Sequence, residues 1–180
     1  MRLIRSPRQM MQVAQRLRRQ GKRIGVVPTM GALHEGHLSL IRAAARANHV
    51  VIVTIFVNPL QFGPREDFTH YPKPFARDLR LAREAGADFI FSPTVQQLYP
   101  DGFVSRIHVG PLGERWEGRS RPGHFDGVAT VVSILFHLTQ PTTAYFGQKD
   151  YQQTLVIRRL VDDLRLDLRL RVLPTVREPD

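Results

Sequence analysis

Two histidines, His34 and His37, stand three residues apart at the end of the stretch P-T-M-G-A-L-H-E-G-H. The segment just before this stretch, R-I-G-V-V at 23–27, is mostly apolar and β-branched, which predicts a short buried strand. Residues 38–48 carry apolar side chains at helical spacing, which predicts a helix. The imidazoles therefore fall at a strand-to-helix junction, where unpaired backbone N–H groups and the helix dipole favour a bound phosphate.

The H-x-G-H pattern limits what the two imidazoles can do. A zinc protease helix needs H-E-x-x-H, and the spacing here is one residue short. A pair of general bases would need a nucleophile close by, and none stands beside them in the sequence. Two hypotheses remain for rings that share one face of a helical turn. They donate to phosphate oxygens of a nucleotide, with Gly36 letting the backbone approach, or they are simply solvated.

Polar side chains also follow two other predicted strands. Asn58 and Gln61 come directly after the apolar run 50–57, which is typical of a central parallel strand. Lys149 follows the short strand predicted at 144–147, although a single lysine is more often a surface residue. Because the carboxyl ends of parallel strands meet at one edge of the sheet, where α/β proteins bind ligands, we expect these side chains to join the histidines.

The other segments supply a frame of alternating strands and helices. Ser6 and Pro7 begin a helix that Gly21 ends, and Pro28 ends the first central strand. Further predicted elements are a helix at 75–85, a strand at 88–91, a possible strand at 103–109, a helix at 128–138, a helix at 151–164 capped by Asp150, and a strand at 168–172.

Strand, helix and strand in succession predict right-handed βαβ units. The expected fold class is therefore α/β, a Rossmann-like open parallel sheet with helices on both faces. A length of 180 residues suits one domain, so we expect residues 1–180 to form a single unit.

The composition is that of an ordinary globular protein, with 42% hydrophobic and 23% charged residues and no cysteine. A net charge of +10 raises the possibility of a nucleic-acid partner. The basic residues, of which 23 of 26 are arginine, are scattered and not interleaved with aromatic residues, so we expect no such partner. No segment has the apolar length of a signal peptide or a membrane span, which favours a cytoplasmic protein without a membrane partner.

Several motifs together carry a resemblance to a known family. They are P-T-M-G-A-L-H-E-G-H, F-V-N-P-L-Q-F, R-P-G-H-F-D-G-V-A-T-V-V and F-G-Q-K-D-Y-Q-Q, in this order, with E-D and Y-P in the loop after the second motif. The chain resembles the pantothenate synthetases (pantoate–β-alanine ligases) over almost its whole length. H-x-G-H alone marks the wider nucleotidylyltransferase superfamily, whereas its combination with the other motifs is specific.

The resemblance implies a two-step ATP-dependent ligase of coenzyme A biosynthesis. Pantoate and ATP, with Mg²⁺, form pantoyl adenylate and pyrophosphate, and β-alanine then displaces AMP to give pantothenate. The resemblance also implies a homodimer. It gives no position for the metal.

The family's site residues carry over to matching positions of this chain. The implied catalytic residues are His37, in the position of the proton donor, His34 and Lys149. The implied ATP-binding residues are Met30, Gly31, Ala32, Leu33, His34, Glu35, Gly36, His37, Gly147, Gln148, Lys149, Asp150 and Val176. The implied substrate-binding residues are Asn58, Gln61, Tyr71, Gln153 and Met30. The other five histidines, His124 among them, are expected to be structural or exposed.

The chain departs from the family pattern in two ways. Gln148 stands where the family usually has glutamate, which is a modest change. The sequence ends at T-V-R-E-P-D, before the serine–arginine loop and the smaller C-terminal lid domain of the family. The resemblance therefore implies an N-terminal domain with reduced or no turnover. A pantoate- and nucleotide-binding module, or another adenylyltransferase of the same fold, are the alternatives.

Overall fold

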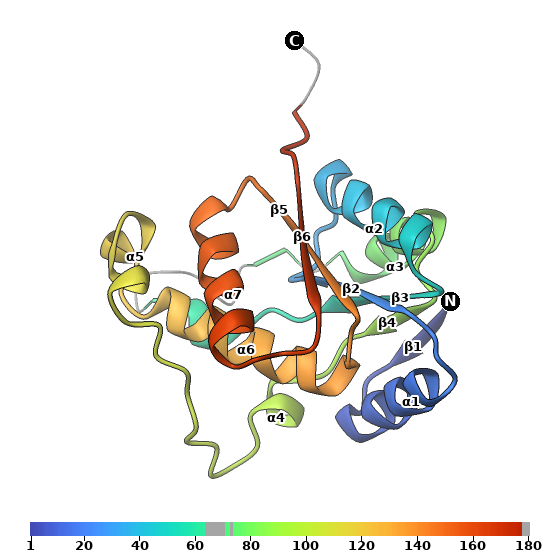
Figure 1. Ribbon diagram of the computed structural model, residues 1–180, viewed down its shortest axis with the longest axis horizontal. Coiled ribbons are helices and arrows are strands. Elements are labelled where there is room, and N and C mark those ends of the chain that lie inside the picture. The colour runs from blue at the N-terminus through green and yellow to red at the C-terminus, as the bar shows by residue number, and fades with distance from the viewer. Residues whose placement is uncertain (64–70, 73, 178–180) are drawn as a thin grey trace.

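The sheet is built on two central apolar strands, β2 (Ile24–Thr29) and β3 (Val50–Ile55), which pair in parallel along their whole length. The computed structural model describes residues 1–63, 71–72 and 74–177. Around the central pair, parallel strands run in the order β1-β4-β3-β2-β5-β6 (Figure 1). The outer strands are β1 (Arg2–Ile4), β4 (Phe89–Phe91), β5 (Thr143–Gly147) and β6 (Arg169–Leu173). The predicted Rossmann-like parallel sheet is confirmed.

Helices cover both faces of this sheet, as predicted (Figure 1). One face is covered by α1 (Pro7–Arg19), α6 (His124–Thr139) and α7 (Tyr151–Asp163), and the other by α2 (Glu35–Ala47) and α3 (Phe75–Glu84). Short helical turns join these elements: η1 (Pro59–Gln61), α4 (Val95–Leu98), η2 (Gly110–Glu114) and α5 (Glu117–Ser120). Within the described ranges, no helix combines the length and the apolar character that a bilayer span requires.

The order of the strands reverses between β2 and β5. From β2 the chain passes outward through β3 to β4, and it then returns to the other side of β2 for β5 and β6. β2 and β5 pair only at Gly25 with Thr143 and at Val26 with Ala144, so the two strands part before their carboxyl ends. Such a switch point opens a crevice at the carboxyl edge of the sheet, where α/β proteins bind ligands.

Pro28 lies inside β2, so the prediction that it ends the strand is wrong. The register with β3 continues through Pro28 to Thr29. A proline has no N–H to donate to a neighbouring strand. The pairing of β2 with β5 has already ended at Val26, so no second ladder is interrupted at this position.

Two helices begin earlier than predicted, and one strand was not predicted. α2 begins at Glu35 because the side chain of His34 caps it, and α6 begins at His124 after Gly123 in a left-handed conformation. β1 has only three residues, and its pairing with the distant β4 stabilises it. A local pattern cannot reveal such a strand, because its partners lie far away in the chain.

Residues 103–109 form no strand, contrary to the prediction. The N–H of Ile107 donates to Thr130 Oγ1 (3.0 Å), and the N–H of Val109 donates to Asp126 Oδ1 (2.9 Å). Both acceptors belong to α6. Ile107 and Val109 therefore lie along α6 with their backbone N–H groups paired to its side chains, and the segment adds no strand to the sheet.

A glycine brings α6 against η1 and fixes the turn that carries Gln61. A Cβ atom on Gly127 would lie 2.2 Å from the carbonyl oxygen of Leu60 and 2.7 Å from the nitrogen of Gln61. Both are backbone atoms, so no side-chain rotation relieves the clash. Glycine is therefore required at position 127 for this close approach.

Gly127→Ala is expected to lower the free energy of unfolding by about 1–3 kcal/mol, the usual effect of overpacking. Alanine ordinarily stabilises a helix interior relative to glycine, so the sign of the change is diagnostic. Urea unfolding followed by circular dichroism measures it. Gly63→Ala, where a Cβ atom would meet none of the described residues within 4 Å, is the control. A Gly127→Ala variant as stable as the wild type would contradict the contact.

Candidate functional site

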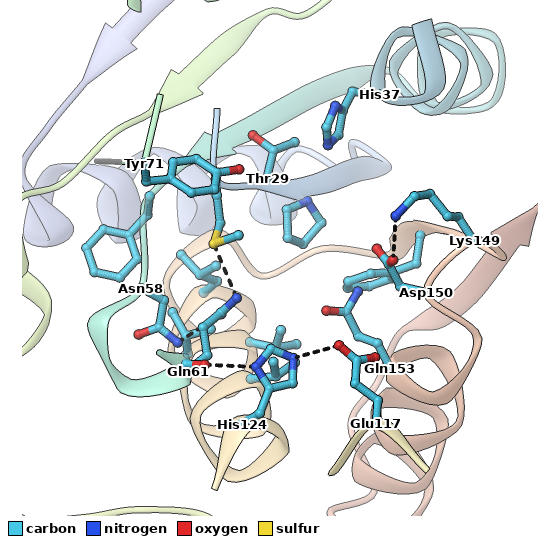
Figure 2. Close-up of a pocket in the computed structure, with 18 of the residues that line it drawn as sticks. Thr29, His37, Asn58, Gln61, Tyr71, Glu117, His124, Lys149, Asp150 and Gln153 are labelled. Atoms are coloured by element: carbon cyan, nitrogen blue, oxygen red, sulfur yellow. Dashed lines mark hydrogen bonds and ion pairs between the residues drawn. The ribbon is translucent and has the colours of Figure 1, made fainter. Parts of the chain in front are cut away.

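A pocket of about 410 Å³ lies at the carboxyl edge of the sheet, over the switch point between β2 and β5 (Figure 2). The turn after β2, the turn η1, the exit of β5 and the helices α6 and α7 meet in it. Nine predicted site residues line it: Met30, His34, His37, Asn58, Gln61, Tyr71, Lys149, Asp150 and Gln153. A smaller adjoining pocket of about 130 Å³ includes three more: Gly36, Gly147 and Val176.

Side-chain acceptors satisfy the backbone amides of the turn after β2. The N–H of Gly31 donates to Thr29 Oγ1 (3.2 Å), and the N–H groups of Ala32 and Leu33 donate to the two carboxylate oxygens of Asp78 (2.8 Å each). Asp78 comes from α3 and is 1% exposed. Its charge-assisted bonds hold Ala32 at a φ of +50°, in the left-handed region. Sequence reasoning missed Asp78, because one aspartate in a helix has no distinguishing pattern.

The rings of His34 and His37 accept the next backbone N–H groups of this turn. His34 Nδ1 accepts the N–H of Gly36 (3.2 Å), and His37 Nδ1 accepts the N–H of His34 (3.4 Å). An acceptor nitrogen carries no proton, so these bonds assign the proton of each neutral ring to Nε2.

The junction was predicted to offer unpaired backbone N–H groups, but the N–H of Gly36 is paired, because the ring of His34 accepts its proton. Glycine at this position makes room for that ring. A Cβ atom on Gly36 would lie 2.9 Å from His34 Cε1. The donors that face a ligand from this turn are therefore imidazole N–H groups in place of this backbone amide.

His37 is held in its neutral form. Burial, followed by the proximity of His34, lowers the pKa of His37 to about 4 from an ordinary 6.5. Asp150 and Asp78 favour the protonated ring, but their effect does not outweigh burial. The two rings lie 4.1 Å apart between centroids, which is too close for both to carry a charge at low cost. At neutral pH, His37 is therefore an uncharged donor through Nε2.

Lys149 supplies the positive charge of this side of the pocket. Its ammonium group lies 3.1 Å from Asp150 Oδ1, and its side chain is 72% exposed. Asp150 occupies the N-cap position of α7 but makes no side-chain cap hydrogen bond, so its predicted capping role is wrong. The carboxylate instead faces the lysine (Figure 2). A long exposed lysine can move to meet an anion that enters the pocket.

The opposite side of the pocket presents the amide of Gln61, held from several directions. Gln61 Nε2 lies 3.2 Å from Met30 Sδ, and its Oε1 accepts from Asn58 Nδ2 (3.1 Å). His124 Nδ1 lies 2.8 Å from the carbonyl oxygen of Gln61, so this nitrogen carries the proton. His124 is 7% exposed and lines the pocket.

An apolar wall closes the pocket between these two polar sides. It consists of Pro28 from β2, Phe56 directly after β3, Phe146 from β5, and Val128, Val131, Val132 and Leu135 from α6. The contribution of α6 was not predicted, although its β-branched run V-A-T-V-V was a usable signal. A site that joins amide and imidazole donors to an apolar wall suits a ligand with both branched alkyl and anionic parts.

The two adjacent glutamines of α7 face different ways. Gln153 lines the pocket, as implied, and points into it in Figure 2. Gln152 is 7% exposed and holds the neighbouring loop. Its Nε2 donates to the carbonyls of Leu112 (3.0 Å) and Arg115 (2.7 Å), and its Oε1 accepts from the N–H of Glu117.

Some implied residues do not line either pocket. Leu33 is buried in the core between the sheet and α2, Glu35 pairs with Arg42 on the helix surface, and Gln148 is exposed. Gly31 borders a separate cavity on the other side of Met30.

Tyr71 lines the main pocket with its ring edge-on to Phe62, 6.1 Å between centroids. Most of the loop predicted at 63–74 lies outside the described residues. Among residues 1–63, 71–72 and 74–177, no group of three His, Asp or Glu side chains converges as a metal site would require.

A family model described as pantoate-beta-alanine ligase matches residues 2–180. The chain belongs to the pantoate-beta-alanine ligase family. It is 52% identical over 180 residues to the pantothenate synthetase of Koribacter versatilis, covering 100% of this chain and 62% of the relative. It is 58% identical over 163 residues to that of Moorella thermoacetica, covering 91% of this chain and 58% of the relative. The chain thus spans about three fifths of the length of these relatives.

Solved structures of the family have the same fold. The crystal structure of pantothenate synthetase from Thermus thermophilus superposes with a TM-score of 0.93 at 51% identity, covering 99% of this chain and 63% of that one. The pantoate-beta-alanine ligase of Francisella tularensis, complexed with beta-gamma ATP and beta-alanine, also gives a TM-score of 0.93, at 42% identity. That match covers 99% of this chain and 69% of the other.

Asp78→Asn is expected to lower the free energy of unfolding by about 1.5–3 kcal/mol, the range for hydrogen bonds to a charged group. An amide has one acceptor oxygen, so its NH₂ group must face one of the two backbone N–H groups that Asp78 accepts. Thermal unfolding measures the loss. Asp88→Asn is the control at an exposed carboxylate, because Asp88 accepts only the N–H of Val51 in the described structure and an amide can keep that bond. Equal losses in both variants would refute the double-acceptor role.

The ligand-free protein should show a neutral His37 down to about pH 4 in an NMR titration of the imidazole resonances, because burial lowers its pKa. Nitrogen-15 shifts should place its proton on Nε2. His108 is the internal control, since its hydrogen bond to Asp126 raises its pKa and it should protonate first as the pH falls. A His37 ring that titrates with or above His108 would contradict the geometry.

Proposed function

We propose that this pocket binds ATP and pantoate, and that the chain is the nucleotide- and pantoate-binding domain of an AMP-forming pantoate–β-alanine ligase. Membership of the family supports the proposal, and so does the Francisella tularensis relative, whose structure contains beta-gamma ATP and beta-alanine. The observation that carries it is the pair of imidazoles, whose Nδ1 atoms accept backbone N–H groups and whose Nε2 atoms remain as donors.

In the first step, a carboxylate oxygen of pantoate attacks the α-phosphorus of ATP, and the bond to pyrophosphate breaks. Negative charge grows on the phosphate oxygens and on the leaving group. The Nε2–H donors of His34 and His37 and the ammonium group of Lys149 are suited to stabilise that charge. Because their Nδ1 atoms are already bonded, the rings need little reorganisation during the reaction.

Pantoate carries a gem-dimethyl group, two hydroxyls and a carboxylate, and the pocket offers matching groups. The α6 valines and Phe56 suit the methyl groups, and the amides of Gln61 and Gln153 suit the polar groups, since an amide both donates and accepts. In the second step, the amine of β-alanine attacks the acyl carbon, the bond to AMP breaks, and the amine loses a proton as pantothenate forms.

A magnesium ion would neutralise phosphate charge when bound. Mg²⁺ is usually held by one or two carboxylates together with substrate phosphates and water, so a nucleotide site needs few protein ligands. Asp150, whose carboxylate lines the pocket beside Lys149, fits this requirement and would hold the ion.

His37→Ala and Lys149→Ala are each expected to slow pantoate-dependent exchange of pyrophosphate into ATP by about 10²–10³, the usual effect of losing one stabilising donor. His37→Gln is the matched variant, because a glutamine can place an N–H donor near the position of Nε2, and it should retain more activity than His37→Ala. Unchanged exchange in both alanine variants would refute the assigned roles.

The same experiment separates the proposal from its alternatives. Pantoate binding in calorimetry without any exchange would favour a binding module. Exchange that depends on another carboxylic acid, with pantoate inactive, would favour a different adenylyltransferase.

A further inference from the structure

The amide of Asn58 has all of its hydrogen bonds within the protein. Its Oδ1 accepts the N–H of Leu60 (3.2 Å) and the hydroxyl of Tyr99 (2.7 Å), and its Nδ2 donates to Gln61 Oε1 (3.1 Å) and to the carbonyl of Gly127 (3.0 Å). Asn58 is 1% exposed. With two acceptor and two donor positions filled, it has no group left for a ligand.

The orientation of this amide is fixed by groups that have only one role. A backbone N–H can only donate, so the atom facing Leu60 must be the oxygen. A backbone carbonyl can only accept, so the atom facing Gly127 must be the nitrogen. It follows that the hydroxyl of Tyr99 donates, and that Gln61 Oε1 accepts from Asn58.

The orientation of the Asn58 amide determines the orientation of the Gln61 amide. With its oxygen turned toward Asn58, the NH₂ group of Gln61 lies toward the pocket, where its neighbour is the weakly accepting sulfur of Met30 at 3.2 Å (Figure 2). Such a group readily gives up a thioether contact for a stronger acceptor. A carboxylate can only accept, so it is attracted by the NH₂ group and would be repelled by the opposite face of the amide.

We propose that Tyr99 is a positioning residue for the pantoate site. Its hydroxyl is a second donor to Asn58 Oδ1 and strengthens the orientation that Leu60 and Gly127 set, which keeps the NH₂ group of Gln61 turned toward the pocket. Tyr99 follows α4 and does not line the pocket. Its ring packs edge-on against Phe56 (5.9 Å between centroids) and at a tilt against Phe103 (4.9 Å), which fixes the direction of the hydroxyl. The identity of the ligand rests on the proposed function, whereas the orientation of the amide does not.

Tyr99→Phe removes one of the two donors to Asn58 Oδ1 and keeps the ring packing. Pantoate affinity in calorimetry should fall roughly 3- to 10-fold, as expected for one buried hydrogen bond, with ATP affinity unchanged. Asn58→Asp cannot donate to Gln61 or to the Gly127 carbonyl, so its pantoate affinity should fall by about 100-fold or more.

Tyr145→Phe is the matched control. Tyr145 is a buried tyrosine whose hydroxyl also bonds an asparagine, Asn48 (2.8 Å), but on the face of the sheet covered by α2. It should lose stability without losing pantoate affinity. Wild-type affinity in Tyr99→Phe, or equal losses of pantoate affinity in the two tyrosine variants, would overturn the proposal.

An NMR readout tests the orientation without pantoate. In the wild type, the side-chain amide protons of Gln61 should show a nuclear Overhauser effect to the methyl group of Met30, and Tyr99→Phe should weaken it while Tyr145→Phe does not. If the wild type fails to bind pantoate, the proposed function fails. The nuclear Overhauser experiment then still tests the positioning role of Tyr99. The absence of the effect between Gln61 and Met30 in the wild type would refute that role.

Discussion

The site depends on one constraint: the backbone N–H groups in the turn after β2 need hydrogen-bond acceptors that the sheet does not provide. Leaving a parallel sheet exposes successive N–H groups, and a buried N–H without a partner is costly. Thr29, Asp78 and the rings of His34 and His37 accept these protons along the turn. The same bonds that stabilise the turn therefore decide which atoms of the imidazoles face a ligand.

This arrangement gives a pocket whose donors are set before any ligand arrives. On one side, the imidazoles present Nε2 protons, and burial keeps His37 uncharged. On the other side, Leu60 and Gly127 fix the amide of Asn58, which in turn orients Gln61. The exposed Lys149, which can move, adds a positive charge beside the imidazoles, and Arg121, paired with Glu117, lines the pocket as well. Donors fixed in advance and a mobile lysine suit a reaction in which negative charge grows on phosphate oxygens and then leaves with a phosphate group.

The topology explains why such distant segments meet. β2 and β5 diverge after two paired residues, so the turn after β2 and the exit of β5 flank one crevice. α6 closes this crevice and reaches η1 only because position 127 has no side chain. The close approach also places the Gly127 carbonyl where it accepts from Asn58 Nδ2. The contact that packs α6 against η1 therefore also helps to orient the polar groups of the site.

The sequence by itself determined the elements with strong local patterns and the residues with distinctive spacing. It predicted the parallel sheet, the junction that holds His34 and His37, and the family. Only the tertiary structure decided which groups are free to act. It assigned the Gly36 amide to His34, brought in Asp78 and Tyr99 from other elements, and separated Gln153 from its neighbour Gln152. A hydrogen bond depends on how a donor and an acceptor are oriented toward each other. When the two groups come from distant parts of the chain, residue spacing within one segment cannot reveal that orientation.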